Sequence, residues 1–497
     1  MNSNFRKIQP IELSKAAIIP QSLDNQWVPK PLLDRMIKEN KNLKDVDVKV
    51  EREKYVLKEW RRALTYGEQV VVNRAFMFNN AVVVDDYDDA QNREHFKELL
   101  NTGVIIPYLY TEESPDEKPA NFDSNNILWN TWLHVVQETE MSCVRLDWNK
   151  QEDDFERLAK IYHEYIQTIN VKSEGLAKNF GVANDDLTAF DDKLYEMTIF
   201  AADNFQKLKS EGPSKKYISR NLIYQKYVCE DGSNVADGYY SSKKPFAAAI
   251  KQIADLKYNV NLPDALGRYA LTPEDSPPRA ALGDLDATAR AQVITNENVK
   301  EVLYSLRRLA FDHIAQGLFI KSLSDLSLGD VIQVRDTKNW KEYQAAMHSL
   351  LDNPLDFANR SAILYAKFES LNEELTRIKI NAQTASWQPW VKFFITAGTK
   401  TIELLVNPSD PTQKYWTSIG TEAISTGATP FLMRMVISGL TNADADLEYS
   451  LDFMRGTIQN GRDTMTEIIG SLTPENGFNI LKDSTILKHD ATISQPE

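Results

Sequence analysis

Apolar side chains that recur every three or four residues constrain the fold of this chain more than any other feature of its sequence. Between residues 358 and 383 they stand at Leu364, Phe368, Leu371, Leu375 and Ile378. This spacing places them on one face of an α-helix. Similar patterns dominate from about residue 151 onward. We therefore expect a mainly α-helical protein.

A stretch nearer the N-terminus departs from this pattern. Residues 68–87 are rich in β-branched and aromatic side chains, which predicts one or two strands. A helical pattern over 89–103 ends at a glycine, and an apolar run follows at 104–112. Strand, helix and strand together predict a small parallel α/β unit. Pro107 indicates an edge strand or a strand end, and residues 142–148 predict another short strand.

The length of 497 residues predicts about two or three packed units. Three prolines within residues 271–286 mark the clearest border. We expect a multi-domain chain with a charged N-terminal segment, a small α/β unit, a helical domain, a linker, a C-terminal helical domain and a tail: 1–65, 66–150, 151–270, 271–286, 287–480 and 481–497.

Charge is distributed unevenly along the chain. The net charge is -14, yet residues 1–65 hold 14 Lys and Arg against 9 Asp and Glu. Any binding of nucleic acid would therefore use the basic segment 38–64. The alternative is a solvated helix or arm, because the charges of this segment alternate in sign. We find no secretory signal pattern and no apolar run long enough to span a membrane, so we expect a cytoplasmic protein.

Four aspartates follow an apolar run at residues 81–84, and Asp85, Asp86 and Asp88 are candidate ligands for Mg²⁺ or Mn²⁺. Carboxylates at the end of a buried strand suit such hard cations. The spacing of Asp86 and Asp88 resembles the motif of the haloacid-dehalogenase phosphatases, although Asp89 and Ala90 stand where that family has Gly-Thr. The alternative is that Asp88 or Asp89 caps the following helix.

Arg308 and His313 form an Arg-x4-His pattern that resembles the active motif of HEPN-type ribonucleases, which cleave RNA without a metal. The resemblance implies that His313 transfers protons and that Arg308 stabilises charge on the phosphorus. Leu309 stands where that family usually has a polar residue. The alternative is a structural histidine on the apolar stripe of a helix.

A polar cluster lies in a segment that we expect to be irregular: Asn259, Asn261, Asp264, Arg268 and Arg279. These side chains either form turns or belong to a functional site. We expect two further irregular segments, 127–133 and 386–390, which contain tryptophans. Two alternatives stand for these side chains: they anchor a protein partner, or they belong to the hydrophobic core.

No sequence pattern identifies a cofactor. We expect a protein that recognises a protein partner or a second copy of itself. The alternative is a nuclease or phosphoesterase, which would bind RNA through Arg308 and His313 or a metal through Asp85, Asp86 and Asp88.

Overall fold

The computed structural model describes residues 4–110, 112–118, 127–146, 148, 177, 180–211, 220–274, 276, 311, 318–319, 323–352, 357–378 and 386–387. The described chain is mainly helical and has a small parallel sheet near the N-terminus, as the sequence predicted. The sheet has six strands, of which the sequence predicted those within residues 68–112 and 142–148. No helix in these ranges is long and apolar enough to cross a membrane.

The strands of the sheet are short and lie in the order β1-β5-β4-β3-β2-β6. Every pair of neighbours is parallel. The strands are β1 (Arg6–Ile8), β2 (Ile18–Pro20), β3 (Val70–Asn73), β4 (Ile105–Tyr108), β5 (Ser142–Val144) and β6 (Tyr269–Leu271). A separate antiparallel pair joins β7 (Leu318–Phe319) to β8 (Ser386–Trp387).

Both faces of the sheet are buried. Val70 and Val72 belong to the large hydrophobic cluster on one face, whereas Val71 between them belongs to the cluster on the other. Ile105 and Ile106 divide in the same way. Successive side chains of a strand point to opposite faces, so a near-continuous apolar run fits a strand covered on both sides.

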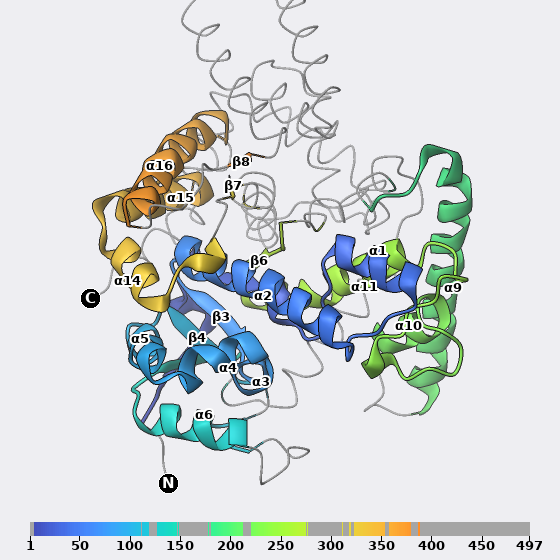
Figure 1. The fold of residues 1–497 in the computed structure, drawn as a ribbon, viewed down its shortest axis with the longest axis horizontal. Helices are drawn as coiled ribbons and strands as arrows, with labels where there is room; N and C mark the ends of the chain where they lie inside the picture. The colour runs from blue at the N-terminus through green and yellow to red at the C-terminus, as the bar shows by residue number, and fades with distance from the viewer. Residues whose placement is uncertain are drawn as a thin grey trace, which may run out of the picture.

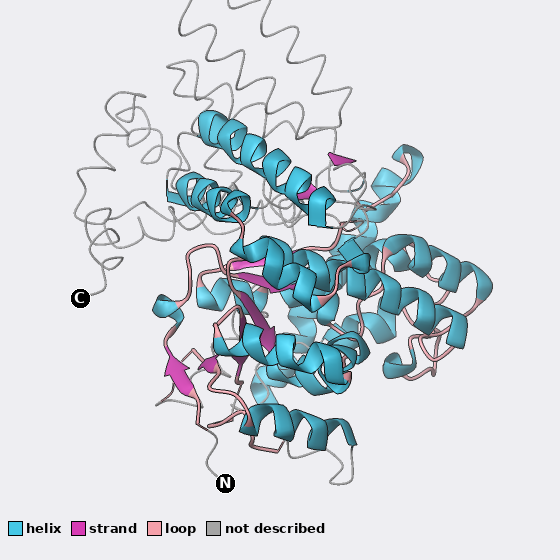
Figure 2. Cartoon of the chain, turned by 60° about the vertical axis from the view of Figure 1, so that its left-hand side comes forward, coloured by secondary structure: helices cyan, strands magenta, loops and turns pink. Residues whose placement is uncertain are grey.

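Helices connect successive strands and surround the sheet, as Figures 1 and 2 show. Two helices lie between β2 and β3, three between β3 and β4, and one between β4 and β5. They are α1 (Lys30–Glu39) and α2 (Val46–Tyr66), then α3 (Arg74–Asn79), α4 (Ala81–Asp88) and α5 (Ala90–Asn101), then α6 (Ile127–Gln137).

Two further groups of helices pack around α1 and α2. The first is α9 (Leu187–Glu211), α10 (Arg220–Tyr227) and α11 (Ala247–Asn259), which share a hydrophobic cluster with α1, together with α12 (Asn261–Leu266), which packs on β2 and β6. The second is α14 (Leu328–Asp336), α15 (Lys338–Asp352) and α16 (Phe357–Ile378), of which α14 packs on α2 and α5. In Figure 1 these groups lie on opposite sides of α2.

The predicted strand, helix and strand are confirmed as β3, α5 and β4, and residues 142–148 contain β5. The possible second strand within residues 68–87 is wrong. The residues after β3 form α3 and α4, and the Asn80 side chain caps α4 by accepting a hydrogen bond from the Val82 backbone amide. Pro107 lies near the end of β4, but β4 is an inner strand and not an edge strand.

Three expectations of irregular or solvated structure are also wrong. Residues 127–133 lie in α6, and Trp129 and Trp132 are core side chains. Most of the segment 259–271 forms α12 and β6. The second half of α2 is buried rather than solvated, because Glu59, Arg61 and Arg62 find polar partners inside the fold.

Candidate functional site

The candidate site surrounds the β2 loop, which we define as residues 21–28 after β2. The loop starts at the carboxyl end of an inner strand, between β3 and β6 in the sheet. The strand order reverses here, since β3 lies on one side of β2 while β6, the last strand of this six-stranded sheet along the chain, lies on the other. Open α/β sheets bind ligands at the carboxyl ends of strands near such a reversal.

Asp24 is the central side chain of the β2 loop and is 4% exposed. Its Oδ2 accepts hydrogen bonds from Arg220 at 2.6 Å and from the side-chain amide of Asn259 at 3.1 Å. Its Oδ1 accepts one from the backbone N–H of Gln26 at 3.0 Å. Burial alone would raise the pKa of Asp24. The Arg220 charge and these hydrogen bonds outweigh burial and lower the pKa to about 2.

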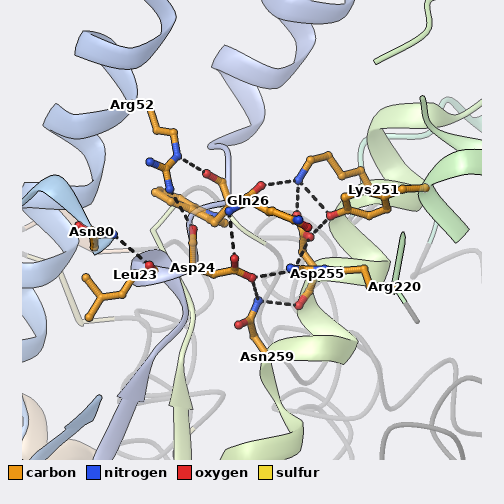
Figure 3. A network of polar contacts seen from close by, with 11 residues as sticks. Leu23, Asp24, Gln26, Arg52, Asn80, Arg220, Lys251, Asp255 and Asn259 are labelled. Atoms are coloured by element: carbon orange, nitrogen blue, oxygen red, sulfur yellow. Dashed lines mark hydrogen bonds and ion pairs between the residues drawn. The ribbon is translucent and has the colours of Figure 1, made fainter. Parts of the chain in front are cut away.

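A second buried carboxylate, Asp255 of α11, lies beside the first (Figure 3). Arg220 bridges the two, because its NH1 also donates to Asp255 Oδ1 at 3.1 Å. The Tyr224 hydroxyl and the Lys251 ammonium donate to the same carboxylate. The positive charges of Arg220 and Lys251 therefore offset the repulsion between the Asp24 and Asp255 carboxylates.

Burial also shifts the pKa values of the two other donors to Asp255, Lys251 and Tyr224. It lowers the pKa of Lys251, while the neighbouring Asp255 acts in the opposite direction. It raises the pKa of Tyr224 well above its ordinary value, and the Asp255 charge adds to this effect. The Tyr224 hydroxyl, 3.2 Å from Lys251 Nζ, thus keeps its proton at neutral pH.

The backbone of the β2 loop is held as firmly as the Asp24 side chain. Arg52 of α2 donates to the carbonyls of Asp24 at 2.9 Å and Trp27 at 2.7 Å. Lys251 donates to the Gln26 carbonyl at 2.8 Å. Asn80 at the start of α4 donates to the Leu23 carbonyl at 2.9 Å. Three helices therefore fix the shape of one short loop.

This arrangement collects two carboxylates and three basic side chains in a buried place. Such groups can orient the polar atoms of a ligand and can hold or move protons. The sequence prediction missed Asp24, Arg220, Tyr224, Lys251 and Asp255, and it included only Asn259. The available signal was the spacing of four residues between Lys251, Asp255 and Asn259, which places the three on one face of a helix.

The three predicted metal ligands lie on α4 and have different surroundings. The Asp86 carboxylate is buried against Arg61, which donates to both oxygens, and the Trp60 indole donates to Oδ2 at 2.8 Å. Asp85 and Asp88 are exposed. Partial desolvation of the Asp85 carboxyl, followed by the charges of Asp86 and Asp88, raises the pKa of Asp85. Asp89 caps α5, as the capping alternative predicted.

The structure describes only some of the other residues that the sequence predicted for a site. The described ranges contain no group of three or more His, Cys, Asp or Glu side chains that could hold a metal ion. Arg308, His313 and Arg279 lie outside the described residues. Asn261 starts α12, and Arg268 donates to the carbonyls of Pro10 and Leu13. Of the predicted polar cluster, Asn259 therefore joins the Asp24 network.

Comparisons of the sequence and the fold with known proteins found no similarity that assigns a function. No family model, no curated protein and no solved structure matches the chain.

We predict that Asp86 is a structural side chain whose loss destabilises the fold without any metal. Asp86→Asn leaves the buried Arg61 guanidinium without its carboxylate, so the free energy of unfolding should fall by about 3 to 5 kcal/mol. Urea denaturation with a chelator present measures this change. In the exposed control Asp85→Asn the change should stay within about 0.5 kcal/mol. A rise in the unfolding midpoint with Mn²⁺ that Asp85→Asn abolishes would instead support the metal hypothesis.

Proposed function

We propose that this protein binds a small polar ligand at the carboxyl end of β2, between the β2 loop and the helices α10 to α12. One observation carries the proposal: Asp24, Asp255, Arg220 and Lys251 form a buried charged cluster at this end of the sheet. Clusters of buried titratable groups with specific charged partners are a physical mark of functional sites.

The energetic cost of the cluster supports the proposal. Removing ions from water costs several kcal/mol for each ion, and well-packed apolar side chains often stabilise a fold as well as a buried ion pair does. The cluster also occupies the edge of the sheet where parallel α/β proteins bind ligands. Binding of a ligand by the buried charged side chains would explain why the fold keeps them in place of apolar side chains.

We predict that binding protects two segments of the chain from hydrogen exchange. Thermal unfolding of the wild-type protein is first measured with sugars, amino acids, carboxylic acids, nucleosides and inorganic phosphate. Hydrogen–deuterium exchange with the most stabilising compound should then slow at residues 21–28 and 247–266. Protection confined to other segments, or no stabilising compound in the panel, would contradict the proposal.

A second proposal is recognition of a second copy of this protein, one of the two kinds of partner expected from the sequence. Tyr195 and Ile199 support it, because they lie one turn apart on α9 and are 58% and 45% exposed. The double variant Tyr195→Ser and Ile199→Ser should weaken self-association in sedimentation experiments. Ile363→Ser on α16, which alters another exposed apolar side chain, is the control. Unchanged association of the double variant would contradict this proposal for α9.

A further inference from the structure

One face of α15 packs on the junction where α2 ends and β3 begins. Its polar side chains there stand four residues apart, which places them along one side of the helix. The Trp340 indole donates to the Thr65 carbonyl at 2.7 Å, and the Gln344 side-chain amide donates to the Tyr66 carbonyl at 2.7 Å. The end of a helix leaves such carbonyls without an internal partner, so α15 helps to cap α2.

The next turn of α15 makes a contact that depends on protonation. His348 Nε2 lies 2.7 Å from Glu68 Oε2, and the Ser14 hydroxyl donates to the same oxygen. One turn further on, Asp352 forms an ion pair with Lys15 at 3.0 Å. The side chains of His348 and Glu68 are 32% and 37% exposed, so both can exchange protons with solvent. These two pairs connect α15 to the residues that precede β2 and β3.

The charges around His348 favour its protonated form. The hydrogen bond to Glu68 raises the pKa of His348 above its ordinary value, and the charges of Glu68 and Asp352 act in the same direction. Burial and the charge of Lys15 act in the opposite direction and are outweighed. The imidazole is therefore more readily protonated in the folded protein than in an unfolded chain.

Glu68 keeps its charge over the same pH range. Burial acts to raise the pKa of Glu68, but the hydrogen bond and charge of His348, with the charge of Arg335 on α14, outweigh burial and lower it. From α16, Lys367 pairs with Glu342 at 2.8 Å, six residues before His348. Among the described groups around this contact, His348 is the one whose ordinary pKa lies nearest to neutral pH.

We propose that α15 is held on this junction by a pH-sensitive contact, which is tight while His348 is protonated and looser once His348 has lost its proton. A neutral imidazole can still donate from Nε2, so the loss of charge weakens the contact without removing it. The hydrogen bonds of Trp340 and Gln344 do not titrate. The loosening is therefore confined to the second half of α15, residues 345–352.

The direction of the pH effect follows from the raised pKa of His348. Its contribution to stability is complete below about pH 6.5, the ordinary value for histidine, and is lost as the pH rises through the raised pKa. Glu68 has a lowered pKa, so its contribution is complete above about pH 4.5 and is lost only in more acidic solution. The contact is therefore tightest in mildly acidic solution and weakens toward alkaline pH.

A titration of the histidine rings by proton NMR tests whether His348 is paired in this way. The chain has six histidines, and the variant His348→Gln assigns the signal. The wild-type midpoint should lie above 6.5, and Glu68→Gln, which removes the charge and keeps an acceptor, should lower it. A wild-type midpoint at or below 6.5, or an unchanged midpoint in Glu68→Gln, would overturn the proposal.

Hydrogen–deuterium exchange of the full chain tests whether α15 responds. Once the rates are divided by the intrinsic rate at each pH, exchange at residues 345–352 of the wild type should rise at least about twofold from pH 6 to pH 9. In His348→Gln and in Glu68→Gln this rise should be absent. Both variants keep the capping bonds of α15, so we expect them to fold.

His134→Gln on α6 is the matched control, because His134 is an exposed histidine far from α15 in sequence. It should keep the wild-type response to pH. A wild-type exchange rate that does not change with pH, or a rise that persists in both His348→Gln and Glu68→Gln, would show that this contact does not respond to pH.

Discussion

The ion pair between Asp24 and Arg220 is the interaction on which the described structure most depends. It joins the loop after β2 to α10, and its partner Asp255 extends the connection to α11. Arg52 and Asn80 attach the same loop to α2 and α4. This short segment therefore ties the parallel sheet to α10 and α11 through side chains, beside the direct packing of α12 on β2 and β6.

Arginines hold loop carbonyls elsewhere in the fold as well. Arg145 donates to the carbonyls of Glu112 at 2.9 Å and Trp148 at 2.6 Å. Arg335 of α14 donates to the carbonyls of Leu64, Gly67 and Glu68 at the end of α2. Strands of three or four residues leave many backbone groups outside the sheet, and buried groups need partners. Guanidinium groups with several donors meet this need.

The sequence predicted the elements whose signals are local and missed those whose partners are distant. Helical spacing identified α16, and β-branched runs identified β3 and β4, because each pattern lies within a few residues. Strands β1, β2 and β6 are three residues long, which gives only a weak pattern, and they were missed. β5 is equally short, although residues 142–148 were predicted to contain a strand. Asp24 resembles an ordinary turn residue, since its partners Arg220 and Asn259 lie 196 and 235 residues away.

The most direct measurement compares the free energy of unfolding of wild type and Asp24→Asn from pH 6 to pH 3 by urea denaturation. A carboxylate whose pKa falls from 3.8 to about 2 on folding stabilises the protein above pH 4, and this contribution is lost as pH falls toward 2. The free energy of unfolding of the wild type should therefore be higher than that of the variant at pH 6, and this difference should shrink toward pH 3. The ionised Asp24 contributes about 2 kcal/mol in all, of which only a part is lost by pH 3. A difference that is absent at pH 6, or that does not change with pH, would contradict the central place of the ionised Asp24.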